Sequence, residues 1–306
     1  MTQSCMRFAF LFLLFSSPFL AAKPISQGIW SWSQSAFDSA KGRQQLIAFC
    51  SSENISRVDQ HLSIRLHNGQ RQLENQAELR KLLKSAHPQI SINALRGDKK
   101  MFFAVNHQRT LKDLQLVISF NQSQPKKQRL SGMKYDVEPY LTEEWKRSAS
   151  ARKKVMLDYL HCLVKIKKAL KESRSSMKLH VDVPFWWDKP EHTLSFQNKT
   201  QPFTHHIQDL TDAISIMSYR RDAHKIIALS AAELDYANKI GKTNSVSVGV
   251  ETIKINGSES FISFHGLPAI KFRNTVRQLH STLKTNRASS GVMIHEYRSL
   301  QAYLKK

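Results

Sequence analysis

The sequence has little glycine, little proline and very little cysteine. Its 306 residues include 10 Gly, 9 Pro and 3 Cys, which excludes collagen-like repeats, a Pro-rich disordered chain and a disulfide framework. Acidic residues are also scarce, with 24 Asp and Glu against 46 Lys and Arg, so the formal net charge is +22. Such a charge favours anionic partners (nucleic acid, phospholipid headgroups or acidic polymers) without choosing among them. The apolar share of 41% indicates a globular protein with a large core.

Long apolar runs are missing beyond the start of the chain. There, Arg7 precedes the eight apolar residues 8–15, and the small pair Ala21-Ala22 follows. Eight apolar residues are too few to cross a bilayer, which needs about 20, and the pattern is typical of a secretory signal. An uncleaved anchor is the alternative, because Leu20 is a poor residue for cleavage after Ala22. We therefore expect residues 1–22 to be a signal peptide. We expect residues 23–306 to form one exported domain, periplasmic or secreted, with no membrane span.

Two cysteines remain after the signal segment. Cys50 and Cys162 each lie in an apolar helical pattern, which predicts two buried thiols. One disulfide between them is the alternative in an oxidising compartment.

Several binding motifs are absent. The basic residues are dispersed, and there is no helix-turn-helix, zinc-finger or aromatic-basic motif, so we expect no specific nucleic acid partner. There is also no P-loop and no Gly-x-Ser-x-Gly elbow, which argues against nucleotide binding and serine hydrolysis. We expect no cofactor, and a monomer.

Short apolar or β-branched runs alternate with helical patterns along the whole chain. The expected strands are Gly28–Ser33, Arg57–Leu66, Ile90–Arg96, Ser131–Glu138, Met177–Pro184, Ala213–Tyr219, Ser245–Glu251 and Gly291–Tyr297. The expected helices are Gln34–Ser52, Leu73–Ala86, His107–Phe120, Glu143–Glu172, Ala223–Ile240 and Leu267–Leu283, with a weak helical signal over 189–211 and a last turn after Arg298. This alternation predicts an α/β fold with parallel strands, and eight such units suit a single (β/α)8 TIM-type barrel. A doubly wound open sheet is the alternative, but no Gly-rich phosphate loop follows the first strand.

In such a barrel the catalytic residues lie at the carboxyl ends of the strands. The expected strand ends are unusually rich in polar and aromatic side chains: Trp30, Trp32, Arg96, Asp98, Asp136, Glu138, His180, Asp182, Tyr219, Arg220, Glu251, His295 and Glu296.

Asp136-Val137-Glu138 is the sharpest of these features. Residues two apart on a strand point to the same side, so both carboxylates would face the barrel mouth. Like charges held close together raise one pKa, which makes the pair an acid–base device. The alternative is a salt-bridged pair, with Lys134 on the same face as the partner.

The residues around this pair resemble a known family. Residues 132–138, GMKYDVE, resemble the fourth-strand signature of family 18 glycoside hydrolases (chitinases and their relatives), an Asp-x-Asp-x-Glu run that ends in the catalytic acid. Met217-Ser218-Tyr219 is similar to the sixth-strand Met-x-Tyr of that family, and residues 291–297 are similar to its eighth strand. The string YDVEPY, residues 135–140, also resembles exported bacterial proteins with a predicted hydrolase-like barrel.

The resemblance implies a role for three residues. Glu138 would be the general acid that protonates the glycosidic oxygen. Asp136 would orient the 2-acetamido group of the substrate, which acts as the nucleophile, and Tyr219 would hold the acetamido oxygen. The implied partner is a carbohydrate, such as an amino-sugar polymer of a cell wall.

The sequence also departs from the family pattern. Lys134 and Ser131 stand where the signature has acids, His295 replaces the tryptophan that forms the floor under the sugar, and Arg220 replaces a common Asp. A different sugar, a different bond or a loss of catalysis would each fit. A sugar-binding barrel without catalysis is therefore the alternative function.

Further strand-end residues are candidates for substrate binding. Trp30, Trp32 and Trp186 offer surfaces for stacking on sugars, although packing is an equal alternative. The polar candidates are Arg96, Asp182, Glu251, His295 and Glu296. A weaker alternative is metal-assisted hydrolysis through His180, Asp182, Glu251 and His295. No His-x-His or His-Glu-x-x-His spacing supports it, and we expect no metal.

Overall fold

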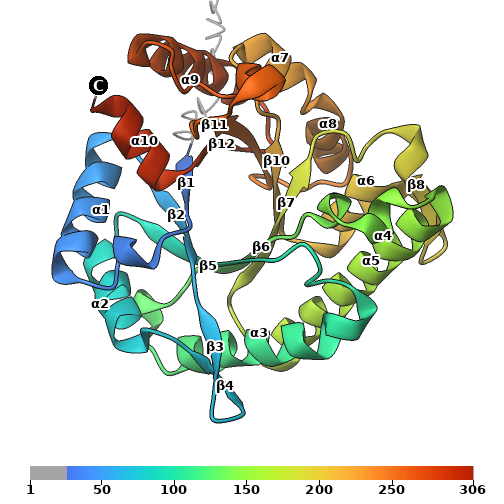
Figure 1. Cartoon of the computed structure of the whole chain (residues 1–306), viewed down its shortest axis with the longest axis horizontal. Helices are drawn as coiled ribbons and strands as arrows, with labels where there is room; N and C mark the ends of the chain where they lie inside the picture. Colours follow the sequence, from blue (N-terminus) through green and yellow to red (C-terminus); the bar gives the residue numbers. More distant parts are fainter. Residues whose placement is uncertain (1–25, 306) are drawn as a thin grey trace, which may run out of the picture.

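The computed structural model describes residues 26–305, which form a closed eight-stranded barrel (Figure 1). The strand order around the barrel is β1-β12-β11-β10-β7-β6-β5-β2, and every neighbouring pair is parallel. The barrel strands are β1 (Gln27–Ser31), β2 (Arg57–His61), β5 (Ser91–Gly97), β6 (Gly132–Asp136), β7 (Lys178–Pro184), β10 (Ala213–Met217), β11 (Val246–Glu251) and β12 (Ser289–His295). Because β1 pairs with both β2 and β12, the sheet closes. The predicted (β/α)8 barrel is confirmed, and the open sheet is wrong.

The helices form a ring outside the strands (Figure 1). They are α1 (Ala40–Ser52), α2 (Gln76–Ala86), α3 (His107–Gln122), α4 (Glu143–Lys146), α5 (Ala149–Glu172), α6 (Phe203–Leu210), α7 (Ala223–Ala228), α8 (Ala231–Lys239), α9 (Ala269–Leu283) and α10 (Tyr297–Leu304). Short 3₁₀ helices lie in the connections: η1 (Gln34–Ala36), η2 (Ala104–Asn106), η3 (Lys126–Gln128), η4 (Pro139–Leu141), η5 (Pro190–His192) and η6 (Gly257–Ile262).

Three expected helices are interrupted, and serine marks each break. The side chains of Ser39 and Ser148 accept hydrogen bonds from the backbone N–H groups of Gly42 and Ala151, so α1 and α5 begin after them. Ser230 separates α7 from α8. At Ser39 and Ser148 the N-cap side chain satisfies an N–H that the first turn leaves without a partner, which favours a new start over one long helix. The hydroxyl of Ser230 instead donates to the carbonyl of Ile226.

Two hairpins were not predicted. The expected strand over residues 57–66 ends at His61, and β3 (Ile64–His67) pairs with β4 (Gln70–Leu73) instead. Asn68 and Gly69 between them have φ of 48° and 77°, the conformation that a tight hairpin turn requires. The region with the weak helical signal holds a second hairpin, β8 (Thr193–Phe196) with β9 (Lys199–Pro202), before α6 begins.

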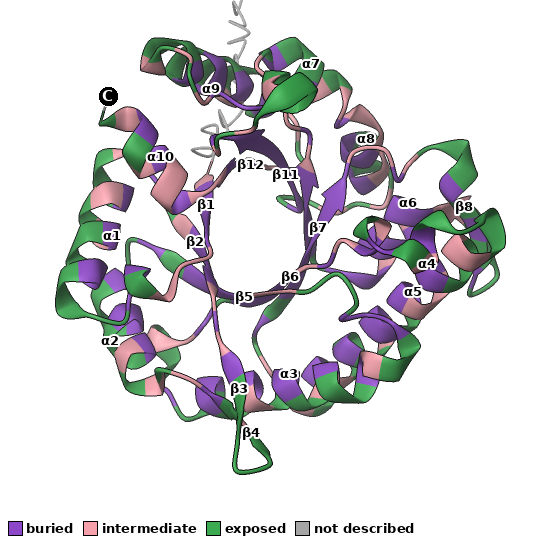
Figure 2. Ribbon diagram, in the orientation of Figure 1, coloured by how far each residue is buried: buried purple, intermediate pink, exposed green. Residues whose placement is uncertain are grey.

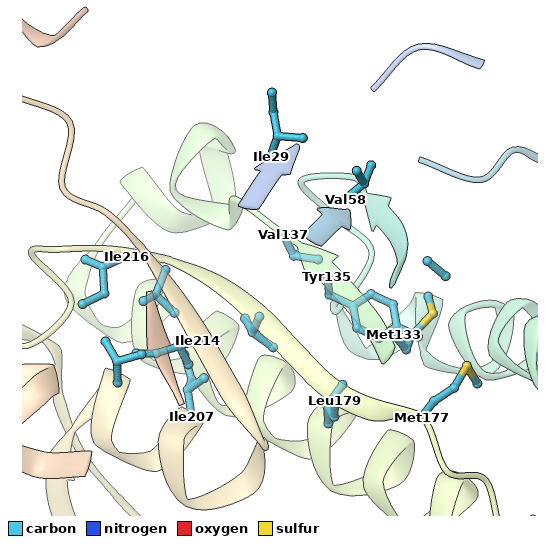
Figure 3. Close-up of a cluster of buried hydrophobic side chains, with 14 of the residues drawn as sticks. Ile29, Val58, Met133, Tyr135, Val137, Met177, Leu179, Ile207, Ile214 and Ile216 are labelled. Carbon is cyan, nitrogen blue, oxygen red and sulfur yellow. The ribbon is translucent and has the colours of Figure 1, made fainter. Parts of the chain in front are cut away.

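The two faces of the barrel strands differ in chemistry. Side chains on the outer face, such as Ile29, Met133 and Leu179, pack with the helices in one large apolar core (Figure 3). Figure 2 shows that the buried residues follow the strands and the inner sides of the helices. Inside the barrel, residues 26–305 form one small buried apolar group of Trp30, Leu95 and Met293. Most of the interior is therefore polar, whereas bulky branched apolar residues usually fill such barrels.

The sequence also made predictions about the two cysteines, a signal peptide and membrane spans. Cys50 and Cys162 are buried and unbridged, which confirms two buried thiols; burial raises the pKa of each to about 12. The predicted signal peptide, residues 1–22, lies outside the described residues. Over residues 26–305, none of the helices has the length and hydropathy needed to span a membrane.

Candidate functional site

The interior of the barrel is organised around a buried lysine. Lys134 Nζ lies 2.8 Å from Asp182 Oδ1 and 3.3 Å from Asp59 Oδ2, and all three side chains are inaccessible to solvent or nearly so. The ammonium also donates to Ser215 Oγ at 2.6 Å. Lys134, Asp59 and Asp182 come from β6, β2 and β7, and we call them the Lys134 cluster. A buried charge needs a partner of this kind, because an unpaired one would lose its hydration without compensation.

Neutral donors complete the Lys134 cluster. Asn93 Nδ2 donates to Asp59 Oδ1 at 2.7 Å, and the indole Nε1 of Trp30 donates to Asp182 Oδ2 at 2.9 Å. Lys134 Nζ also lies 5.2 Å from the centre of a Trp30 ring. Trp30 is therefore an interior packing and hydrogen-bonding residue, only 1% exposed. This corrects its predicted role as a surface for stacking on sugar.

The two carboxyl groups of the Lys134 cluster titrate differently. Burial acts to raise the pKa of Asp59, but the nearby charges of Lys134 and Arg57 outweigh burial and hold the pKa below its usual range. Burial raises the pKa of Asp182 to about 6, even though Lys134 opposes the change. Asp182 is thus the member that can carry a proton close to neutral pH.

Asp136 and Glu138, which we call the carboxyl-end pair, lie at the carboxyl end of β6: Asp136 is its last residue and Glu138 follows it. Asp136 Oδ1 is buried and has no hydrogen-bond partner among residues 26–305. Burial raises the pKa of Asp136 well above its usual value, and the negative charges of Asp182 and Glu138 raise it further. Lys134 forms its ion pairs with Asp59 and Asp182, so the salt bridge considered as an alternative for the carboxyl-end pair is replaced by the Lys134 cluster.

Glu138 is held by a residue that was not predicted. Glu138 is the N-cap of η4, and the hydroxyl of Tyr140 donates a hydrogen bond to Glu138 Oε1. Tyr140 packs edge-to-face against Trp186, with ring centres 5.2 Å apart. Trp186 is partly buried in this aromatic group, next to the residue that orients Glu138. The YDVEPY string already contained the signal, since it places a hydroxyl donor two residues after the acid.

Tyr219, His295 and Trp32 meet on the side of the barrel formed by β10, β12 and β1. The rings of Tyr219 and His295 stack, with centres 6.0 Å apart and planes at 23°. Trp32 Nε1 donates to His295 Nε2 at 3.1 Å. Burial raises the pKa of the Tyr219 hydroxyl well above its usual value, and the nearby Glu251 adds to the shift. The hydroxyl of Tyr219 therefore stays protonated and remains a donor.

Hydrogen bonds at both ring nitrogens hold the side chain of His295 in one orientation. Its Nδ1 lies 2.8 Å from Glu251 Oε2. An indole N–H can only donate, so Nε2 is the acceptor and Nδ1–H donates to Glu251. The other oxygen of Glu251, Oε1, accepts from the backbone N–H groups of Thr252 and Ile253, both at 2.7 Å. Burial acts to lower the pKa of His295, but the hydrogen bond that Nδ1–H donates to Glu251 and the negative charge of Glu251 outweigh burial, so the net shift is upward.

Two predicted substrate-binding residues lie elsewhere. Arg96 Nη2 donates to Asp113 Oδ2 of α3 at 3.1 Å, and Nη1 donates to the carbonyl of Leu62 at 2.6 Å. Arg96 thus ties β5 to α3, because its neighbour Leu95 is the residue that faces the interior. The carboxylate of Glu296 accepts from the backbone N–H groups of Arg298 and Ser299 and caps α10. The structure thus shows both side chains in contacts that hold elements of the fold together.

The four residues considered for metal binding are not brought together as a ligand set. Asp182 belongs to the Lys134 cluster, whereas Glu251 and His295 bond to each other. Burial and the nearby Arg57 lower the pKa of His180 to about 3. Within the described part of the chain, no group of three or more His, Cys, Asp or Glu side chains is arranged to hold a metal ion.

Comparison with known proteins gives a likeness of fold. No protein-family model and no curated protein matches the sequence. Among solved structures, a chitinase from Chromobacterium violaceum has a TM-score of 0.51 at 13% identity, covering 92% of this chain and 98% of its own. A chitinase from Bacteroides thetaiotaomicron gives 0.51 at 13% identity, with 89% of each chain covered. A glycoside hydrolase family 18 N-acetylglucosaminidase from Paenibacillus barengoltzii gives 0.51 at 11% identity, covering 92% and 99%. The chain thus has the fold of a glycoside hydrolase family 18-like TIM barrel.

Proposed function

We propose that this protein hydrolyses a glycosidic bond in a glycan that contains amino sugars, with Glu138 as the general acid. The observation that carries the proposal is the carboxyl-end pair. Asp136 is buried with a raised pKa, and Glu138 is oriented by the hydroxyl of Tyr140. The likeness of fold to chitinases and to an N-acetylglucosaminidase supports this reaction class.

The chemistry requires one proton shared between two neighbouring carboxyl groups. Two like charges in a buried site do not both ionise readily, and the raised pKa of Asp136 favours keeping a proton on the carboxyl-end pair. When Glu138 holds it, Glu138 can protonate the glycosidic oxygen as the bond to the leaving sugar breaks. Asp136 is then ionised and faces the N–H of the 2-acetamido group, whose oxygen attacks the anomeric carbon.

Tyr219 and the residues behind it complete the proposed site. The Tyr219 hydroxyl donates to the acetamido oxygen and orients it toward the anomeric carbon. Tyr219 is supported by its stack on His295, which Trp32 and Glu251 hold in one orientation. Water then attacks the cyclised intermediate, and Glu138 takes the proton from that water. We place this activity outside the cytoplasm, on the signal-like pattern of residues 1–22.

A sugar-binding barrel without catalysis is the second candidate. Lys134 occupies the position of the first Asp of the signature and is committed to Asp59 and Asp182. The first acid of the family run is therefore absent, and a cation stands in its place beneath Asp136. This arrangement would let the barrel hold a sugar without a turnover step.

The experiment measures reducing-end release from a panel of oligosaccharides with and without N-acetylglucosamine. We expect wild type to release reducing ends and Glu138→Gln to be slower by about 100-fold or more. Glu143→Gln is the matched control, because the side chain of Glu143 is 87% exposed on α4. Equal rates for wild type and Glu138→Gln would contradict the proposal. Calorimetric binding without any release would favour the second candidate.

A further inference from the structure

Arg220 occupies an unusual position directly after Tyr219. Its guanidinium carbon lies 5.2 Å from the centre of the Phe185 ring and 5.3 Å from the centre of the Phe261 ring. Phe185 follows β7 and Phe261 lies in η6 after β11, and β10, which leads to Arg220, runs between those two strands in the barrel. The two aromatic rings therefore come from the loops on either side of Arg220.

The positive charge of Arg220 is not neutralised by an acidic side chain within the described part of the protein. Nη1 donates to the carbonyl of Tyr219 at 2.7 Å, and no carboxylate among residues 26–305 forms a salt bridge with the guanidinium. A guanidinium has five N–H donors, so most of them have no partner here. Aromatic rings attract a guanidinium without neutralising it. Arg220 is thus held in position with its N–H groups available.

The segment that carries Phe261 is itself anchored. The neighbouring Arg221 donates to the backbone carbonyls of Ser260 and Ser263, at the end of η6. Phe261 is 50% exposed, so half of its surface remains accessible beside the guanidinium of Arg220. The two successive arginines therefore have different roles. Arg221 anchors the segment that carries Phe261, and Arg220 follows Tyr219 with its guanidinium between two aromatic rings.

From this arrangement we infer that Arg220 forms a binding subsite for an anionic substituent, so that the substrate is an acidic glycan. The planar fork of N–H groups matches a carboxylate or a sulfate on the sugar next to the one that Tyr219 holds. This inference rests on the proposed function and names its substrate class. A neutral amino sugar would leave the charge of Arg220 without a counterion, whereas an acidic one would pair with it.

The test measures binding by calorimetry in a Glu138→Gln background, so that turnover does not interfere. The probes are amino-sugar oligosaccharides of equal length that are neutral, carboxylated or sulfated. We expect Arg220→Gln to weaken binding of an acidic probe by about tenfold or more and to change neutral binding less than about twofold. The acidic probe that responds more strongly identifies the anionic group.

Controls separate a local effect from net charge and from misfolding. Arg65→Gln removes the same charge from the exposed strand β3 and should leave binding of every probe unchanged. Phe261→Ala removes one exposed ring and should weaken only acidic binding, by a smaller factor than Arg220→Gln. Unchanged thermal unfolding of each variant would exclude misfolding.

Two results would overturn the inference: no loss of acidic binding in Arg220→Gln, or equal losses for acidic and neutral probes. Failure of the proposed function is a separate result. In that case wild type would hydrolyse no probe, while Arg220-dependent binding of acidic probes would still be measured.

Discussion

The Lys134 cluster and the carboxyl-end pair each include one residue of β6, Lys134 and Asp136 respectively, and they differ in the presence of a matched cation. In the cluster, Lys134 pairs with Asp59 and Asp182, and the net effect on Asp59 is a lowered pKa. In the pair, Asp136 has a buried oxygen without a hydrogen-bond partner and a strongly raised pKa. Within the Lys134 cluster, the nearby cations keep the pKa of Asp59 low, whereas burial still raises the pKa of Asp182 to about 6. Asp136 forms no ion pair among residues 26–305, and its pKa is raised furthest above the usual value.

The two groups should therefore respond differently to substitution. Removing a residue from a balanced group should affect folding most, because the remaining charge is left buried. Removing a residue from the unbalanced pair should relieve repulsion and mainly change how the protein responds to pH.

Lys134→Met should have the largest effect on stability. It leaves Asp59 and Asp182 buried without their cation, and the loss of one partner of a buried ion pair costs about 3–5 kcal/mol. The free energy of unfolding from urea titration measures this, and Lys171→Met on the exposed side of α5 is the control. A loss below about 1 kcal/mol would mean that the two aspartates do not depend on Lys134.

Asp136→Asn should change the pH dependence of stability by a smaller amount. The folded-state pKa of Asp136 lies above its unfolded value, so folding retains a proton and stability falls as pH rises from about 4 upward. Asparagine cannot ionise, so the variant should lose less stability between pH 4.5 and 7.5 than wild type, by about 1 kcal/mol or more.

Urea titrations at the two pH values test this, and the exposed Asp235→Asn on α8 is the control. Asp182, with a pKa of about 6, remains in both proteins and contributes its own decline over the lower part of this range. Parallel pH profiles for wild type and Asp136→Asn would show that Asp136 is ionised throughout.

Tyr140→Phe should have the smallest effect. It removes the hydroxyl that donates to Glu138 Oε1, and the loss of one such hydrogen bond costs about 0.5–1.5 kcal/mol. Tyr303→Phe is a matched control, because the hydroxyl of Tyr303 is buried and makes no hydrogen bond in the described structure. The two variants should therefore differ in their free energy of unfolding. Identical values would indicate that the Tyr140 bond does not hold Glu138 in place.

The fold was predictable because local patterns repeat at the period of a βα unit. Alternating apolar runs and helical patterns predicted a barrel, and eight parallel strands close it. Boundaries were less accurate where turn chemistry competed with the apolar pattern. The predicted strand over 57–66 ended at His61, and the Asn68-Gly69 turn formed a hairpin from β3 and β4. Ser39 and Ser148 began new helices within longer helical patterns.

For the candidate site, the sequence predicted which residues of one strand share a side, but not which residues of other strands and helices they would contact. Alternation along the expected strand 131–138 predicted that Lys134, Asp136 and Glu138 share one side, but it did not show which carboxylates would surround Lys134. Arg96 was misplaced because the end of β5 turns its outer-facing residue toward Asp113 on α3. Trp30 was misplaced because a strand-end tryptophan can stack or pack, and here its N–H meets a buried Asp182.

The amino-acid pattern alone was sufficient for the barrel and for two buried thiols. These depend on periodicity and burial, which are properties of neighbours along the chain. The partners of Lys134, the chain of bonds from Trp32 through His295 to Glu251, and the two rings around Arg220 emerged only after closure of the barrel. Each joins residues from separate strands or loops, and the energy of a buried charge depends on whichever groups the fold places within a few ångströms of it.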